Sequence, residues 1–348
     1  MFEWADGGSL REFWENTPRP SLDIGTMSTL VLETLEQVQG LADGLHTLHV
    51  KGFYRHGDLK PENILRFEDG TRLGRLKIAD FGLAKEHKVL TERRRQPTST
   101  IHGTVRYESP EATRALVVGK EPLSRLSDIW SMGCILLEHI IWLLYEYSEL
   151  DRFNTEMKIN TMDSPPFYRQ NEVTGRVEVQ PRVASWMRHM LQDPECANQP
   201  TSIGDLIALI RDKLLVVNLP RSWTALQEQA QQMDVPGRPR ERASASTMKI
   251  KMNEILAKAR NPTNAGYLFT GTRRIGLKGP NPPQPHGTTR QPRIVDPQME
   301  VDPEDRLTTH APRGPISGDA RPPMPDVDDT PPEPIAVPVP PQMQTVST

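Results

Sequence analysis

The stretch YRHGDLKPENIL gathers a carboxylate, an ammonium and an amide within a few positions of one another. Asp58 lies two residues before Lys60 and five residues before Asn63, and a second carboxylate, Asp80, follows an apolar run further along the chain. Hard cations such as Mg²⁺ take carboxylate and amide oxygens as ligands, so Asn63 and Asp80 could hold one beside phosphate groups. Asp58 is then free to orient a hydroxyl nucleophile, while Lys60 offsets the charge on a moving phosphoryl group. This division of roles is that of phosphoryl transfer.

Two alternatives remain open at this point. Carboxylates at such spacings also occur by chance in surface loops, where they are only solvated. His46 and His49 lie three residues apart on a predicted helix, but no third ligand has convincing spacing, so we interpret them as exposed or core histidines rather than a metal site.

The segments around these residues are predicted to be mostly helical. Leucine and valine recur at steps of three and four over Leu30–Val50, which gives one apolar stripe. The short apolar runs Ile64–Phe67 and Leu76–Ile78 flank turn residues and indicate a β-hairpin. Further helices are predicted at Asp128–Leu144, Arg182–Leu191 and Ser202–Leu215, the last with Ser202 or Thr201 as its N-cap.

The composition changes near residue 235. Many of the 33 prolines of this 348-residue chain fall in the last third, where few aromatic residues are available for burial. We therefore expect residues 221–348 to form a largely disordered, proline-rich tail that serves as a spacer or as a ligand for a proline-binding partner. Within it, a helical period is partly followed by apolar residues that predict a transient helix: Met248, Ile250, Met252, Ile255 and Leu256.

Charge and hydropathy exclude several classes of protein. The formal net charge is −3 and the basic residues are scattered, so nucleic acid is not an expected partner. The most apolar run, Ile135–Leu144, is shorter than the roughly 20 residues that span a bilayer and is interpreted as a buried helix, with no membrane partner. The start of the chain lacks the pattern of a secretory signal. Cys134 and Cys196 suit a reducing interior, so we expect an intracellular location, cytoplasmic or nuclear.

Four motifs in order resemble those of eukaryotic protein kinases. They are HGDLKPEN at His56–Asn63, the triplet Asp80-Phe81-Gly82, the segment GTVRYESPE, and SDIWSMGCILLE, whose Asp128 is expected to brace the loop of Asp58. The lysine at position 60 resembles the residue found there in the serine/threonine subclass of these kinases. This resemblance implies that Ser and Thr hydroxyls of proteins accept the phosphoryl group. The resemblance implies a mainly α (α+β overall) fold, that of the C-terminal kinase lobe, with a small β-hairpin at the cleft.

Residue roles follow from the same resemblance. It implies ATP and Mg²⁺ as cofactors, Asp58 as the group that orients or deprotonates the substrate hydroxyl, and Lys60 at the γ-phosphate. Asn63 and Asp80 are implied as metal ligands, and Thr104 as a residue that orders the peptide site.

The first ten residues, MFEWADGGSL, resemble the hinge between the two kinase lobes. The resemblance implies that backbone groups near Glu3 and Ala5 bind adenine, that Asp6 and Ser9 lie near the ribose, and that Leu65 forms an apolar floor beneath the base. We accordingly expect residues 1–220 to comprise the hinge and C-terminal lobe only.

Departures from the family pattern lead to further expectations. If Met1 is at the hinge, the N-terminal lobe with its glycine-rich loop and lysine is absent, and activity is impaired; a non-catalytic scaffold or binding module is the alternative function. Gly57 stands where many kinases have an arginine that pairs with a phosphorylated activation segment, so we expect activity that does not require such phosphorylation. Gln199 stands where the family often has an arginine that pairs with the counterpart of Glu111, which predicts a lower lobe of reduced stability.

Overall fold

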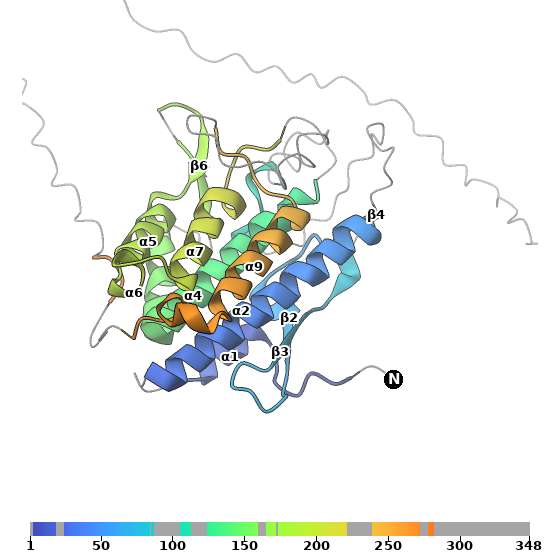
Figure 1. Ribbon diagram of the computed structural model, residues 1–348. Helices are drawn as coiled ribbons and strands as arrows, with labels where there is room; N and C mark the ends of the chain where they lie inside the picture. The colour runs from blue at the N-terminus through green and yellow to red at the C-terminus, as the bar shows by residue number, and fades with distance from the viewer. Residues whose placement is uncertain are drawn as a thin grey trace, which may run out of the picture. The chain divides into compact units, whose positions relative to one another are not determined.

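The computed structural model of the chain describes nine stretches of residues, which together form one helical body. They are residues 3–18, 24–83, 85–86, 105–112, 124–158, 165–171, 173–220, 239–271 and 278–281. Within them the mostly helical prediction is confirmed (Figure 1). The helices are α1 (Leu10–Asn16), α2 (Ile24–His46), α4 (Leu126–Met157), α5 (Pro181–Leu191), α6 (Pro194–Ala197), α7 (Ser202–Leu209), α9 (Ala245–Ala259) and α10 (Ala265–Leu268).

Short irregular turns extend or join these helices. α2 continues as a π-helical turn at Thr47–Lys51, and α7 continues as another at Ile210–Leu214. Among the described residues, 3₁₀ turns occur at Pro61–Asn63, Phe81–Leu83, Val105–Tyr107 and Pro262–Asn264.

The strands form small antiparallel pairs. β2 (Ile64–Phe67) pairs with β3 (Arg75–Ile78), with Ile64 opposite Ile78, so the predicted hairpin is confirmed. β1 (Tyr54–Arg55) pairs with β4 (Lys85–Glu86), and β5 (Tyr168–Gln170) pairs with β6 (Val177–Val179). The β2–β3 hairpin lies against α2, as Figure 1 shows. At its open end, the loop before β2 meets the loop after β3.

The periodicity of the sequence located α2, α5, α7 and the first half of α4. The stripe predicted over Leu30–Val50 is the buried face of α2, which begins earlier, at Ile24. Thr201 is the N-cap of α7, because its hydroxyl accepts a hydrogen bond from the amide of Gly204 at 3.2 Å. The predicted helix at Asp128–Leu144 is the first half of α4, whose backbone breaks at Glu146 (φ 74°) before it continues to Met157.

Helix α4 passes through the middle of the body. It is long and apolar enough to cross a membrane by length and composition alone, but its most apolar window is entirely buried inside the protein. The aromatic and aliphatic side chains on its first half that have no exposed surface include Trp130, Ile135, Leu137 and Trp142. Burial on all sides is what a central helix of a compact domain requires, and it explains why the apolar run is not amphipathic.

The prediction of a disordered tail from residue 221 is wrong for part of that range. Residues 239–271 are described and contain α9, which packs along α2 and α7 (Figure 1). Met248 and Met252, assigned at first to a transient helix, are completely buried. A row of polar contacts also joins α9 to α2; it includes Gln39 with Asn253 at 3.1 Å and Glu36 with Arg260 at 2.7 Å. The helical body therefore extends well past residue 220, while residues 221–238, 272–277 and 282–348 lie outside the described residues.

The prediction that Glu111 lacks an arginine partner is also wrong. Arg242, which has no exposed surface, makes a two-pronged ion pair with Glu111: Nη1 lies 2.5 Å from Oε1 and Nη2 lies 3.1 Å from Oε2. The guanidinium also donates to the carbonyl oxygens of Val216 and Leu126, and it lies over the ring of Trp130. Gln199, the residue expected at this place, instead donates to the carbonyl of Gly266 at 3.0 Å. The arginine comes from the residues just before α9.

A buried histidine joins three helices in the core. Trp14 Nε1 of α1 donates to His139 Nδ1 of α4 at 2.9 Å, and His139 Nε2 lies 3.2 Å from the hydroxyl of Thr34 on α2. Because Nδ1 accepts, the ring proton lies on Nε2 and the imidazole is neutral. Burial lowers the pKa of His139 from 6.5 to about 4. The folded protein therefore resists protonation of this side chain.

We expect this histidine to make stability depend on pH. With a pKa of 6.5 in the unfolded chain and about 4 in the folded protein, His139 contributes stability that is fully present above pH 6.5 and lost as the pH falls toward 4. The loss from pH 7.5 to pH 5 is about 2 kcal/mol from this group. Urea unfolding at both pH values, followed by tryptophan fluorescence, measures it. His139→Gln should have the flatter profile of the two proteins, and equal pH slopes would contradict the assignment.

Candidate active site

The loop that carries Asp58 is anchored to α4 through Asp128. The backbone amides of His56 and Gly57 donate to the Asp128 carboxylate at 2.8 Å and 2.9 Å, and His49 Nε2 lies 2.8 Å from the same carboxylate. Asp128 is only 1% exposed. Burial by itself would raise the pKa of Asp128, but the hydrogen bond and charge of His49 and the two amides lower it overall. The carboxylate therefore stays charged and holds the loop.

His49 is the residue of this anchor that sequence analysis missed. Its pattern in the sequence is that of any helical histidine, and nothing local indicates that its partner lies 79 residues further on. The interpretation as a core histidine is correct, since His49 is buried.

Gly57 adopts a backbone conformation that glycine tolerates best. Its φ is 84°, in the left-handed region where a side chain brings strain. This conformation turns its amide toward Asp128 Oδ1. The glycine in place of the family's usual arginine thus has a local structural reason, in addition to the loss of charge that the sequence indicated.

Asp58, Lys60 and Asn63 form one hydrogen-bonded group. Lys60 Nζ lies 2.8 Å from Asp58 Oδ2, and Asn63 Nδ2 lies 3.2 Å from the same oxygen and 2.7 Å from the Asp58 carbonyl. Among the described residues, no hydrogen bond reaches Asp58 Oδ1 or Asn63 Oδ1. One carboxylate oxygen of Asp58 is therefore fixed and the other is available to a substrate, while the amide oxygen of Asn63 is available as a ligand.

The hairpin register brings Asp80 to the same place. Asn63 immediately precedes β2, and the amide of Ala79 donates to its carbonyl at 2.9 Å, just beyond the Ile64–Ile78 pair. Asp80 follows directly, so it lies at the same end of the hairpin as Asn63. Asp80 is exposed, and its φ of 61° is in the left-handed region, a strained conformation that clusters at functional sites.

His56 ties the two loops together. Its ring is completely buried, its Nε2 lies 2.8 Å from the carbonyl oxygen of Ala79, and its Nδ1 accepts from the amide of Asp58 at 3.3 Å. The ring centroid lies 5.1 Å from that of Phe81. The His56 side chain therefore links the loop of Asp58 to the loop of Asp80, in addition to the Ala79–Asn63 hydrogen bond.

The residues expected at the hinge run beside β2. Gly7 and Gly8 exchange backbone hydrogen bonds with Arg66 at 3.1 Å and 2.8 Å, and Ser9 forms a bridge with Leu65. The half-buried Leu65 thus lies next to this segment.

Three of the expected nucleotide residues already have partners for their side chains within the chain. Asp6 Oδ1 accepts from the amide of Glu68 at 2.8 Å, and Glu3 pairs with Lys77 at 2.6 Å and with Arg75 at 2.8 Å. Ser9 is the N-cap of α1 in a reciprocal capping box with Glu12. The Ala5 carbonyl accepts from the Gly8 amide at 3.4 Å. Thr104 lies outside the described residues.

The described residues include no group of three or more His, Cys, Asp or Glu side chains that could hold a metal ion. Asn63 and Asp80 together supply an amide and a carboxylate, which suits a cation that keeps waters and phosphate oxygens as its other ligands.

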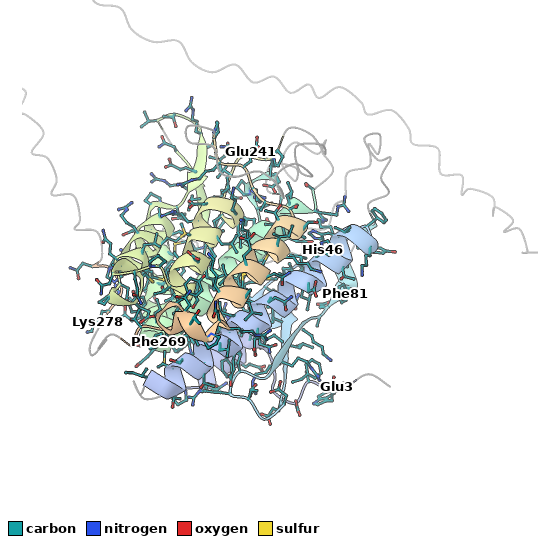
Figure 2. All side chains as sticks on the ribbon, viewed as in Figure 1. Glu3, His46, Phe81, Glu241, Phe269 and Lys278 are labelled. Atoms are coloured by element: carbon teal, nitrogen blue, oxygen red, sulfur yellow. The ribbon has the colours of Figure 1, made fainter. Side chains whose placement is uncertain are left out.

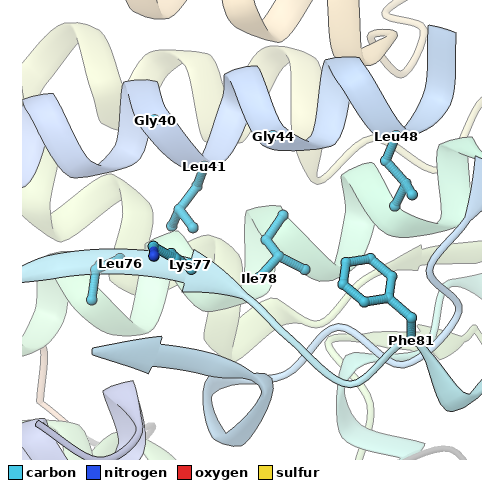
Figure 3. Close-up of a pocket in the computed structure, with 8 residues that line it drawn as sticks. All are labelled: Gly40, Leu41, Gly44, Leu48, Leu76, Lys77, Ile78 and Phe81. Atoms are coloured by element: carbon cyan, nitrogen blue, oxygen red, sulfur yellow. The ribbon is translucent and has the colours of Figure 1, made fainter. Parts of the chain in front are cut away.

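A pocket of about 260 Å³ lies beside the loop of Asp80, between α2 and β3 (Figure 3). Leu41 and Leu48 line it from the helix, and Ile78 and Phe81 line it from the other side. Phe81 is 50% exposed. The Phe81 side chain, next to Asp80, thus has free surface against which another apolar group can pack.

Comparison with known proteins agrees with the motifs. The protein kinase domain family matches residues 1–201. The chain is 42% identical over 106 residues to a probable cell division protein kinase of Encephalitozoon cuniculi, and this match covers 30% of this chain and 35% of that protein. It is 37% identical over 142 residues to a probable serine/threonine-protein kinase of Dictyostelium discoideum, covering 40% and 10%. It is 32% identical over 139 residues to the serine/threonine-protein kinase nekl-2 of Caenorhabditis elegans, covering 40% and 35%.

The similarity covers only part of each relative. The matched stretches span at most 35% of the length of these three proteins.

Proposed function

Because this chain belongs to the protein kinase domain family, we propose that it transfers the γ-phosphoryl group of ATP to serine and threonine hydroxyls of proteins. The observation that carries the proposal is the arrangement at Asp58. Oδ2 of this carboxylate is held by Lys60 and Asn63, whereas Oδ1 is open. A carboxylate fixed in this way can orient a hydroxyl and accept its proton.

The other roles follow from the same arrangement. Lys60 contributes a positive charge next to the reacting groups and offsets the negative charge of the phosphoryl group in flight. Asn63 and Asp80 would hold Mg²⁺, since both lie at one end of the hairpin and offer the oxygen donors that this cation prefers. Among the described residues, Asn63 Oδ1 is open, and Asp80 Oδ1 accepts from the amide of Gly82 at 3.2 Å, which leaves Oδ2 for the cation. When bound, Mg²⁺ neutralises charge on the phosphate oxygens.

The nucleotide would lie along the segment beside β2. The Ser9–Leu65 bridge supports a role of Leu65 under the adenine, with backbone groups near Glu3 and Ala5 at its edge. Because Asp6 and Ser9 already hold the local structure, we propose that they shape the ribose site mainly through the backbone they fix.

Transfer of ³²P from [γ-³²P]ATP to a generic Ser/Thr substrate tests the proposal. We expect Mg²⁺-dependent transfer by the full chain and a loss on the order of 10²- to 10³-fold in Asp80→Asn, since that substitution removes a charge at the metal position. Asp69→Asn is the matched control, because Asp69 also accepts from an amide two residues further on, in the exposed turn of the hairpin. Transfer equal in Asp80→Asn and in the control would reject the metal role.

A specific observation also favours a non-catalytic function. The pocket between α2 and β3, with the half-exposed Phe81 at its rim, suits the apolar side chain of a protein partner. If wild type and Asp80→Asn both transfer no phosphate, this second function, that of a binding module, replaces the first.

A further inference from the structure

A short segment of the chain, Lys278–Asn281, lies against the outer side of α4 and α5. It follows a stretch that the structure does not describe, and Lys278 is on the opposite side of the body from Phe81 (Figure 2). The contacting side chains come from α4 beyond its break and from α5; these are Glu149, Arg152, Arg182, Trp186 and His189, which we call the α4–α5 docking surface.

All hydrogen bonds described between this surface and the segment go to backbone atoms of the segment. Glu149 accepts from the amide of Gly279 at 2.8 Å. The other contacts are to carbonyl oxygens: His189 Nε2 to Lys278 at 2.8 Å, Arg152 Nη1 and Arg182 Nη2 to Pro280 at 2.9 Å and 3.2 Å, and Arg182 Nη1 to Asn281 at 3.1 Å. Each of the four residues therefore forms a backbone hydrogen bond with the surface, and none of the described hydrogen bonds uses a side chain of the segment.

Sequence selectivity comes from Gly279 and Trp186. A Cβ atom at Gly279 would lie 2.0 Å from Cη2 of the Trp186 ring and 2.5 Å from two further ring atoms. The ring cannot move aside easily, because it is completely buried and meets Tyr145 and Phe153 edge to face. Only glycine fits at this position, and the proline after it cannot donate an amide hydrogen that would otherwise need a partner.

The docking surface is preorganised by its own charges. Arg152 pairs with Glu149 and with Glu156, and Arg182 pairs with Glu156. These ion pairs fix both guanidinium groups, so that they meet the carbonyl oxygens without further loss of side-chain freedom. The arginines also lie over the Trp186 ring, at 5.1 Å and 6.0 Å from its centroid.

We propose that the α4–α5 docking surface is a recognition site for an extended glycine-proline peptide, and that its occupant is the chain's own Lys278–Asn281. The surface binds the backbone of the segment and leaves no room for a side chain at residue 279. The Lys278 side chain is exposed and does not contribute to recognition. The site fixes Lys278–Asn281 on the side of the body away from Phe81 (Figure 2). It is independent of the proposed phosphoryl transfer, so either proposal can fail alone.

Hydrogen exchange of the full chain, followed by mass spectrometry, tests the docked state directly. In wild type, the Gly279 amide should exchange at least about tenfold more slowly than in an unstructured peptide, because the residue is buried and the amide is bonded to Glu149. Gly279→Val should abolish this protection at residue 279, whereas the matched control Lys278→Ala, next to it, should retain it. Exchange of wild type at the unprotected rate would overturn the proposal without any need for a variant.

Binding in trans tests the recognition itself. A fluorescein-labelled peptide of residues 276–283 should bind the full-length Gly279→Val chain, whose surface is vacated, at least about tenfold more tightly than wild type, whose own segment competes. The same peptide with valine at position 279 should not bind. A valine peptide that binds as well as the glycine peptide, or a glycine peptide that binds neither chain, would overturn the assignment of the ligand.

Discussion

Replacing Asp58 by asparagine is expected to lower phosphoryl transfer by about 10²- to 10⁴-fold, the range for loss of a positioned acid–base group. The geometry is expected to survive, because asparagine keeps an oxygen that can accept from Lys60 and Asn63, as Oδ2 does now. What disappears is the charge on the open side of the carboxylate, the only part that can take a proton from a substrate hydroxyl. The defect should therefore fall on turnover and not on nucleotide affinity.

Initial rates at saturating Mg²⁺-ATP measure the turnover, and displacement of a fluorescent ATP analogue measures affinity. We expect nucleotide affinity within about threefold of wild type, since Asp58 is not among the residues proposed to contact the nucleotide. Asp69→Asn provides the same chemical change in the hairpin turn and should transfer phosphate at the wild-type rate. Turnover of Asp58→Asn above about a tenth of wild type would show that another group accepts the proton.

The candidate site could be predicted from the sequence because its main parts are local. Asp58, Lys60 and Asn63 lie within six positions, and a short loop suffices to bring them together. Asp80 joins them through a hairpin, and the alternation of residues in a hairpin is readable from a sequence. The contact of His49 with Asp128 is different, since it depends on how α4 crosses α2, which no local pattern specifies.

The fold shows the same division between local pattern and long-range packing. The period of leucines identified α2, and the two candidate caps, Thr201 and Ser202, identified the start of α7. Helix α9 was underestimated because its buried methionines lie in a proline-rich region whose average composition indicates disorder, although the helix itself contains no proline. A composition averaged over a long window hides a helix of 15 residues, and α9 gains its stability from packing along α2 that the window does not contain.

Arg242 lies just before α9 and depends on that packing for its contact with Glu111. Its replacement is the second change from which we expect a large effect, here on stability. Arg242→Met should lower the free energy of unfolding by about 3–5 kcal/mol, as is typical when one partner of a buried ion pair is removed. Methionine fills much of the volume, so the cost comes mainly from Glu111, whose carboxylate loses both guanidinium hydrogen bonds. The carbonyl oxygens of Val216 and Leu126 lose a donor as well.

Urea unfolding monitored by tryptophan fluorescence measures this loss, with Trp130 beneath the guanidinium. Arg240→Met is the matched control, two residues away, because Arg240 is 59% exposed on its side chain and pairs only at the surface with Asp212, where an ion pair contributes roughly 0–1 kcal/mol. The double variant Arg242→Met/Glu111→Gln completes a thermodynamic cycle and should recover part of the loss, since it removes the unpaired charge. Equal unfolding free energies for Arg242→Met and the control would mean that the residues before α9 do not stabilise the helical body. A loss confined to Arg242 would instead establish that the folded domain requires sequence that composition alone had assigned to a tail.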